Sequence, residues 1–188
     1  MFHRFFFWLL TVAAMLCPVQ VALSADQQSV VSDSDVRVAR SGGNFTVDLT
    51  MYTPVAPSVA WAVLTDFEHM SQFVPNLTSS QVIERNDTVL KVNQKGVASF
   101  GFFSTNFESI REIRLSPQSE IRAHGVGGNI LRMESVMQLQ AEGAGTRLNY
   151  HAEVRPGFWF PPLIGPALVK HETAEQFTAM LQEMIRRQ

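Results

Sequence analysis

A histidine, a glutamate and an arginine alternate in the last third of the chain, at His151, Glu153 and Arg155. Imidazole, carboxylate and guanidinium groups held together in a cleft could transfer protons in an enzyme. In a β-strand, however, every second side chain points to the same side, and the residues between these three, Ala152 and Val154, are apolar. The alternation therefore predicts that the three ionisable groups face water, and we expect no catalytic residue among them.

The same separation of apolar and ionisable side chains recurs in the predicted strands at 44–53, 130–140 and 146–155. The apolar side carries Phe45, Val47, Leu49, Met51, Leu131, Met133, Met137, Leu139, Leu148, Tyr150, Ala152 and Val154. The polar side carries Asp48, Arg132, Glu134, Gln138, Arg147, Asn149, His151, Glu153 and Arg155. Antiparallel sheets commonly keep one face in water. We therefore expect an almost purely apolar inner face that holds no catalytic group and no metal ligand.

These strands belong to a simple order of predicted elements. The strand at 44–53 is followed by two short helices, then about six antiparallel strands, then one long helix over about the last 25 residues. The short helices are expected at 58–67 and 68–74, a hairpin turn at Asn86-Asp87, and a glycine-rich loop at 125–129. Strands in one run with helices at the ends predict an α+β fold, in which a single antiparallel sheet curves around the C-terminal helix.

The first 25 residues have the layout of a secretory signal peptide. A basic start at Arg4 precedes thirteen uncharged residues, Phe5–Cys17, and small residues follow around Ser24 and Ala25. Thirteen residues are fewer than the roughly 20 that span a bilayer, which favours cleavage after Ser24 or Ala25. We expect a periplasmic or secreted protein. The alternative is a chain anchored in the membrane by an uncleaved N-terminal segment.

The remaining chain is predicted to be a flexible, polar lead-in at 26–40 and a single domain at 41–188. The formal net charge is −2 and like charges do not cluster, so no nucleic-acid partner is expected. The only cysteine, Cys17, lies in the predicted signal peptide, which leaves no disulfide or cysteine metal site in the mature chain. No cofactor is expected.

Several inner side chains suit contact with an apolar ligand. Methionine is flexible and polarizable, so the inner methionines would fit varied apolar partners, or they would simply fill a core. Lys170 projects onto the apolar side of the last helix, where its amine would either extend outward to water or hold a ligand's polar group. The aromatic run Phe158-Trp159-Phe160 would be buried at a rim or contact a membrane surface.

The stretch AWAVLTDFE at 60–68, followed by Phe73-Val74-Pro75-Asn76, resembles the opening motif of the START-like, or SRPBCC, superfamily. Within it, the chain is most similar to the polyketide cyclase/dehydrase and coenzyme-Q-binding branch, over about residues 44–187. The resemblance implies a helix-grip fold with a deep cavity for a lipid, quinone, sterol or polyketide between sheet and helix. It implies structural and rim roles for Trp61, Leu64, Phe67, Phe73, Val74 and Pro75. No cyclase active-site motif is recognised, so the resemblance assigns no catalytic residue.

The sequence thus favours an exported binding or carrier protein for a hydrophobic small molecule, with possible transient contact to a membrane surface. One alternative is a cyclase or dehydratase, which needs an inward acid–base pair. A second is an envelope interaction protein with a filled interior and no ligand. An enclosed apolar space of about 300 Å³ or more under the last helix would favour a ligand. The residues expected to contact it are Met51, Phe73, Val74, Phe100, Phe102, Met133, Met137, Trp159, Ile164, Lys170 and Phe177.

Overall fold

The computed structural model describes residues 29–86, 89–157 and 164–188. Within these ranges, eight strands form one antiparallel sheet in the order β1-β2-β8-β7-β6-β5-β4-β3. The strands are β1 (Arg37–Ser41), β2 (Asn44–Thr53), β3 (Leu77–Arg85), β4 (Val89–Phe100), β5 (Phe103–Ser116), β6 (Glu120–Gly128), β7 (Ile130–Glu142) and β8 (Gly145–Pro156). The helices are α1 (Pro57–Leu64), α2 (Met70–Phe73) and α3 (Gly165–Arg186). The predicted α+β class and helix-grip architecture are confirmed.

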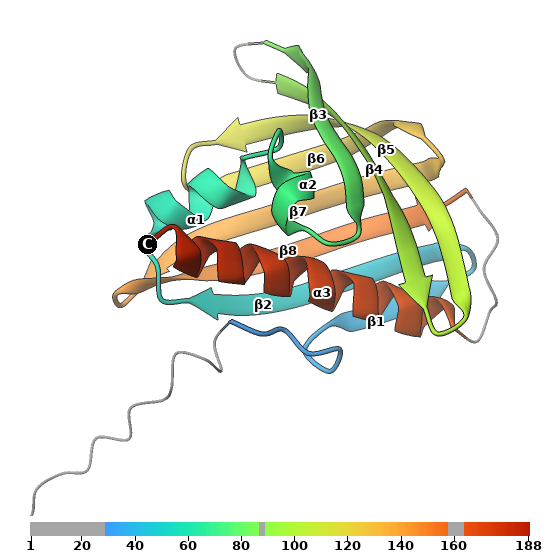
Figure 1. Ribbon diagram of the computed structural model, residues 1–188, viewed down its shortest axis with the longest axis horizontal. Helices are drawn as coiled ribbons and strands as arrows, with labels where there is room; N and C mark the ends of the chain where they lie inside the picture. The colour runs from blue at the N-terminus through green and yellow to red at the C-terminus, as the bar shows by residue number, and fades with distance from the viewer. Residues whose placement is uncertain (1–28, 87–88, 158–163) are drawn as a thin grey trace, which may run out of the picture.

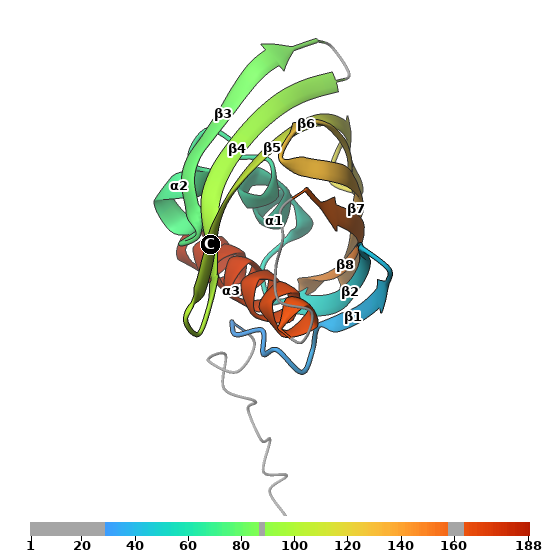
Figure 2. The ribbon, with the colours of Figure 1, turned by 90° about the vertical axis from the view of Figure 1, so that its right-hand side faces the viewer.

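Helix α3 lies along the concave side of the curved sheet (Figure 1). Its Phe177, Leu181 and Met184 are buried, and their spacing of three or four residues places them on one side of the helix. The ring of Phe177 packs 4.8 Å, centroid to centroid, from the ring of Tyr150 on β8. Seen from one end, the sheet forms an arc and α3 lies across its open side (Figure 2).

The predicted sidedness of the strands is confirmed for most positions. Val47 and Leu49 of β2, Leu139 of β7 and Leu148 of β8 are buried in the core. Charged residues of β2, β7 and β8 are exposed on the convex face: Asp48, Arg132, Arg147, His151, Glu153 and Arg155. Because a strand alternates its faces, this pattern fixes which side of the sheet meets α3.

Leu131 is an exception, because it was expected on the inner face and is 67% exposed. The pairing of β7 with β8 shifts between Ile130 and Arg132, which marks a β-bulge. A bulge adds one residue to one strand and reverses the alternation beyond it. Ile130 therefore faces the interior together with Met133, and Leu131 faces water.

The N-terminal part of the described chain also differs from the expectation of a flexible lead-in at 26–40. Residues 37–41 form β1, which pairs with β2 from Arg37↔Asp48 to Ser41↔Asn44. Val31 and Val36 are buried, and the backbone N–H of Val31 donates to Thr178 Oγ1 of α3 at 2.8 Å. This segment is thus held by the sheet and by α3.

The turns in the middle of the chain are only partly those expected from the sequence. A tight turn at Gly101-Phe102 separates β4 from β5. The expected loop at 125–129 is instead mostly the end of β6, which reaches Gly128. The predicted hairpin after β3 is confirmed by the β3–β4 pairing, although Asp87 lies outside the described residues.

The predicted signal peptide at 1–25 also lies outside the described residues. Among the residues that are described, no helix is long and apolar enough to cross a membrane. Export, cleavage and the alternative of an anchored chain remain predictions.

Candidate ligand-binding cavity

A cavity of about 280 Å³ lies between the sheet and α3. This volume is slightly below the value of about 300 Å³ at which the usual range for small-molecule pockets begins. Most of its lining is apolar, and it comes from the strands, from α1, α2 and the turns beside them, and from α3. The apolar lining includes Phe45, Leu64, Phe67, Met70, Val74, Leu77, Phe107, Ile113, Ile121, Ile130, Met133, Met137, Val154, Leu168, Val169, Phe177 and Met180.

The side of α3 that faces the cavity is only partly the side that faces the core. Val169, Thr173, Gln176 and Met180 line the cavity and recur at helical spacing. Lys170 follows Val169 by one residue, and so lies about 100° further around the helix. Lys170 is partly exposed and does not line the cavity. Its predicted contact with a ligand therefore finds no support in the geometry.

Polar side chains of two neighbouring strands, β4 and β5, also line the cavity, although the inner face was expected to be almost purely apolar. Arg111 of β5 donates through its guanidinium to Gln94 Oε1 of β4. Gln94 Nε2 in turn donates to Ser80 Oγ of β3 at 3.0 Å. Ser80 Oγ donates to the carbonyl oxygen of Phe67. A chain of hydrogen bonds thus runs from the turn after α1 to a charged group inside the sheet.

The charge of Arg111 has no carboxylate beside it in the described part of the chain. Its Nε is buried and is without a hydrogen-bond partner there. Burial lowers the pKa of the Arg111 guanidinium, and burial raises the pKa of the nearby Tyr150 phenol. A buried cation without an anion is costly unless another group satisfies it. Arg111 is therefore the strongest polar anchor that the cavity offers.

A second ionisable group in the lining, Glu172 of α3, joins the helix to two other elements. Its Oε1 accepts the backbone N–H of Ser99 on β4 at 2.5 Å, and its Oε2 accepts Nδ2 of Asn76. Burial raises the pKa of the Glu172 carboxyl, and these two hydrogen bonds oppose the change. Oδ1 of Asn76 is buried without a partner among the described residues. Glu172 thus holds the first half of α3 against β4.

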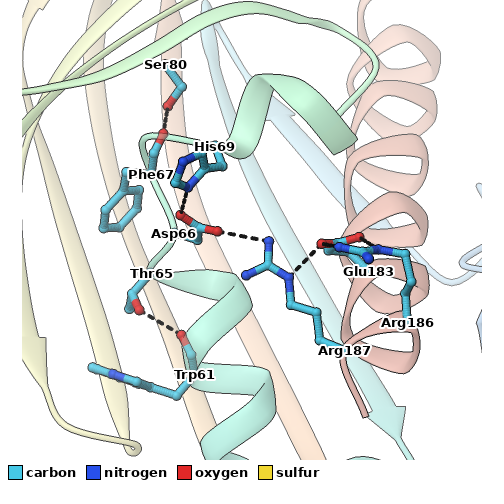
Figure 3. A network of polar contacts seen from close by, with 9 residues as sticks. All are labelled: Trp61, Thr65, Asp66, Phe67, His69, Ser80, Glu183, Arg186 and Arg187. Carbon is cyan, nitrogen blue, oxygen red and sulfur yellow. Dashed lines mark hydrogen bonds and ion pairs between the residues drawn. The ribbon is translucent and has the colours of Figure 1, made fainter.

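A network at the other end of α3 fixes the turn that carries Phe67 (Figure 3). A guanidinium nitrogen of Arg187 lies 2.9 Å from Asp66 Oδ2, and Arg187 Nε lies 2.6 Å from Glu183 Oε1. Nδ1 of His69 lies 2.6 Å from Asp66 Oδ1. Burial would raise the pKa of Asp66, but the hydrogen bonds from His69 and Arg187 together lower it. The end of the motif at 60–68 is therefore held in place by these contacts, where it forms part of the cavity wall.

Four of the eleven predicted ligand contacts line the cavity: Val74, Met133, Met137 and Phe177. Their contact with a ligand stays a prediction. Val74 is 1% exposed, so it is part of the closed wall and not an open rim. Met70, which was not predicted, also lines the cavity.

Six predicted contacts do not line the cavity, and one cannot be placed. Met51 is buried in the core, and Phe73 lies under the guanidinium of Arg187, 5.6 Å from its ring centroid. Phe100 packs edge-on against His171 at 5.7 Å, and Phe102 is 97% exposed in the β4–β5 turn. Ile164 lies just before α3 and Lys170 lies within it, and neither residue lines the cavity. Trp159 lies outside the described residues.

The histidines that resemble a catalytic group in the sequence lie on the convex face, as predicted. Nδ1 of His151 is 2.7 Å from Asp48 Oδ1, and Nδ1 of His124 is 2.6 Å from Glu134 Oε1. All four side chains are substantially exposed. The described residues contain no cluster of histidine, aspartate, glutamate or cysteine suited to a metal ion.

The chain was compared with protein families and with solved structures. The family described as "Polyketide cyclase / dehydrase and lipid transport" matches residues 53–180. A comparison with curated protein sequences finds no match. The fold is similar to that of the Zhui aromatase/cyclase from Streptomyces sp. R1128, with a TM-score of 0.67 and 16% identity over 77% of this chain and 95% of that one.

Two further solved structures share the fold. A START superfamily protein from Mycobacterium smegmatis gives a TM-score of 0.64 at 13% identity, covering 75% of this chain and 97% of that one. A STAR-related lipid transfer protein from Xanthomonas axonopodis gives a TM-score of 0.63 at 14% identity, covering 80% of this chain and 99% of that one. At such identities the likeness concerns the fold alone.

Proposed function

Since the chain belongs to the polyketide cyclase / dehydrase and lipid transport family, we propose that it is a binding or carrier protein for one amphipathic small molecule. The apolar part of the ligand occupies the space between the sheet and α3. Its polar end, a carboxylate, a phosphate or a carbonyl oxygen, meets Arg111. The observation that carries this proposal is an apolar cavity of about 280 Å³ with a cation in its wall that has no carboxylate beside it in the described chain.

The chemistry of the lining narrows the ligand class. The methionines at 70, 133, 137 and 180 offer a soft apolar surface, which suits a lipid tail, a quinone or a polyketide-like chain. Arg111 presents planar donors, and a bidentate hydrogen bond from guanidinium to an acidic group is among the stronger polar contacts in proteins. The Tyr150 phenol lines the same cavity, and burial raises its pKa, so its neutral hydroxyl can be a second donor for the same ligand group.

We propose in addition that the protein is exported and acts outside the cytoplasm. Support for this comes from the charge and apolar pattern of residues 1–25. The mass of the chain purified from a secreting bacterial host should equal that of a protein beginning at Ala25 or Asp26. A chain that keeps Met1–Cys17 at the membrane would contradict cleavage and leave the cavity unaffected.

Extraction of the native ligand tests the binding function. Protein purified without detergent is denatured in organic solvent, and the extract is examined by mass spectrometry. We expect one class of amphipathic molecule in about equal amount to protein. The control is Ala123→Phe, which fills the cavity from a buried lining position on β6 and should lose the ligand while remaining folded. If wild-type protein is empty and takes up no fluorescent fatty acid or quinone, the proposal is wrong.

A cyclase or dehydratase function is the second candidate, because Arg111, Tyr150 and Glu172 line the same cavity. A guanidinium and a phenol could polarise a substrate carbonyl. The test is the appearance of an aromatic product from a short poly-β-ketone thioester, followed by absorbance, with Tyr150→Phe as the comparison. Turnover that depends on Tyr150 would favour the enzyme; binding without turnover would favour the carrier.

A further inference from the structure

The most exposed large apolar side chain in the described chain is Phe102, at 97%. It follows Gly101 in the two-residue loop between β4 and β5, and Gly101 has φ +59. Glycine at the first loop position allows this tight connection, which turns the next side chain away from the sheet. An aromatic ring in open water at the tip of a hairpin brings no stability to the fold. Its exposure instead suits insertion into an apolar phase.

A second exposed apolar residue lies at the same end of the molecule. Leu131 is 67% exposed just after the β6–β7 turn. The β4–β5 turn, the β6–β7 turn and the end of β8 all lie on the right-hand side of Figure 1 and face the viewer in Figure 2. The cavity lining extends to this end, where it includes Ile130, Pro156 and Gly165. Phe102, in the β4–β5 turn, and Leu131, on β7, therefore lie at the same end of the molecule as this part of the cavity.

The segments that present these two residues are unusually poor in charge. Residues 96–107 and 125–131 contain no ionisable side chain, although the chain as a whole is 17% charged. Such segments can leave water without the cost of desolvating a charge. The ionisable residues that border these segments are Lys95 and Glu108, which pair with each other at 3.3 Å, and His124 and Arg132. Arg132 and Arg155 are exposed on the convex face.

Arg132 and Arg155 are directly opposite each other on β7 and β8. Like charges in this position repel, and Glu153, 3.5 Å from Arg132, is the one carboxylate that the described structure pairs with either. Two adjacent guanidinium groups can donate charge-assisted hydrogen bonds to the oxygens of one phosphate group. Beside an exposed leucine, this arrangement matches the boundary between lipid tails and anionic headgroups.

We propose that this end of the protein docks on the surface of an anionic lipid bilayer. Phe102 and Leu131 enter the boundary of the acyl chains, and Arg132 and Arg155 contact headgroup phosphates. The proposal rests on the proposed carrier function, since docking here would bring the cavity against the membrane from which an apolar ligand comes. It gives Phe102 a membrane role in place of the predicted ligand contact.

Co-sedimentation with vesicles tests the docking. The protein used begins at residue 26, because this chain contains every described element and lacks the apolar N-terminal segment, which could bind lipid itself. Vesicles contain phosphatidylcholine alone or mixed with phosphatidylglycerol. Phe102→Ser should lower the binding constant for the mixed vesicles about tenfold. Arg155→Gln should lower it about fivefold on mixed vesicles and have no effect on phosphatidylcholine.

The matched control is Ile83→Ser, which removes a 46% exposed apolar side chain from β3, away from this end (Figure 1). It should bind vesicles as the wild type does. Equal binding by wild type, Phe102→Ser and Ile83→Ser would overturn the proposal, as would a wild type that does not bind mixed vesicles.

Uptake of a fluorescent fatty acid in the absence of vesicles separates this proposal from the carrier function. Phe102 does not line the cavity, so Phe102→Ser should take up the fatty acid as the wild type does. Uptake without vesicle binding would overturn the docking and keep the carrier function. Vesicle binding that depends on Phe102, without any uptake, would support the docking surface and contradict the carrier function.

Discussion

Glu172 Oε1 accepts the backbone N–H of Ser99 at 2.5 Å, and this bond connects the long helix to a strand that lies 73 residues earlier in the chain. The same carboxylate accepts Nδ2 of Asn76, so three segments meet at one ionisable group in the cavity wall. Helix α3 is thus fixed in its first half by Glu172, on the cavity side, and at its C-terminal end by Arg187, at the corner with α1 and α2.

Replacing Glu172 with glutamine should increase stability at neutral pH. Glutamine keeps an oxygen for the Ser99 N–H. Nδ2 of Asn76 now faces the second carboxylate oxygen, so the Asn76 amide must turn over before the glutamine NH2 can donate to its Oδ1, which has no partner in the described structure. The substitution also removes a charge from a place where burial raises the pKa. We expect about 1 kcal/mol of added unfolding free energy for Glu172→Gln and a loss of at least as much for Glu172→Ala, measured by urea denaturation. A glutamine variant that is less stable than the alanine variant would contradict this account.

The raised pKa of Glu172 also makes the stability of the protein depend on pH, in a direction that can be predicted. Its folded pKa is raised above 4.5, so its contribution to stability is fully present below that value and is lost as pH rises through the folded pKa. Unfolding curves at a series of pH values should show this loss in wild type and not in Glu172→Gln. An identical pH dependence in both proteins would remove Glu172 as its source.

Glu183 should have the opposite pH dependence. Hydrogen bonds from Arg186, with a further contribution from Arg187, lower its pKa to about 2 against the ordinary value of 4.5. Stability from this group is complete above pH 4.5 and decreases as pH falls from 4.5 through about 2. The free energy of unfolding of wild type should therefore decrease more steeply over this window than that of Glu183→Gln. Parallel curves for the two proteins would show that the ion pairs around Glu183 do not govern acid stability.

Asp66→Asn tests the corner between α1, α2 and α3. The substitution removes the charge that Arg187 and His69 contact, in a side chain that is 20% exposed. We expect a loss of about 1–3 kcal/mol in unfolding free energy. The control Arg147→Gln breaks an ion pair with Glu142 in which both side chains are more than 40% exposed, and should cause no measurable change. Similar losses from the two substitutions would argue against a special role for the corner.

Arg111→Leu should separate ligand affinity from stability. Leucine removes a buried cation whose Nε is unsatisfied, which should offset the loss of the hydrogen bond to Gln94, so the empty protein should be about as stable as wild type. Affinity for a fluorescent fatty acid should decrease tenfold or more, because the acidic group would lose its charged donor. Arg111→Lys, which keeps the charge without the planar donors, should lie between the two. Unchanged affinity in Arg111→Leu would place the polar end of the ligand elsewhere.

The alternation of side chains in β2, β7 and β8 was sufficient to predict which face of the sheet meets α3. Each of these strands is long, and most apolar residues of each share one parity, so the burial of one face follows from the pattern. The same reasoning placed His151 and Glu153 in water, where the structure has them. The period of Phe177, Leu181 and Met184 predicted the core-facing side of α3 equally well.

Arg111 was the main omission in the candidate site. It has the parity of Ile113 and Leu115 on β5, and this signal in the sequence points inward. A buried arginine is stable in a protein interior only if hydrogen-bond partners reach its guanidinium group. The partner of Arg111, Gln94, belongs to another strand, and the sequence does not determine the register between the two strands. Leu131 was misplaced for a related reason: a bulge depends on the pairing of two strands and leaves no mark in the local pattern.

The order of strands in the sheet has a consequence for how the chain reaches its native state. All neighbours in the sheet are consecutive in sequence except β2 and β8, which pair across about one hundred residues, as at Asp48↔His151. The β1–β2 hairpin therefore has no second neighbour until β8 has been synthesised. Closing so long a loop is slow compared with forming local hairpins. The ribosome must thus synthesise nearly the whole polypeptide before the sheet is complete, so the β1–β2 hairpin stays without its second neighbour through most of synthesis.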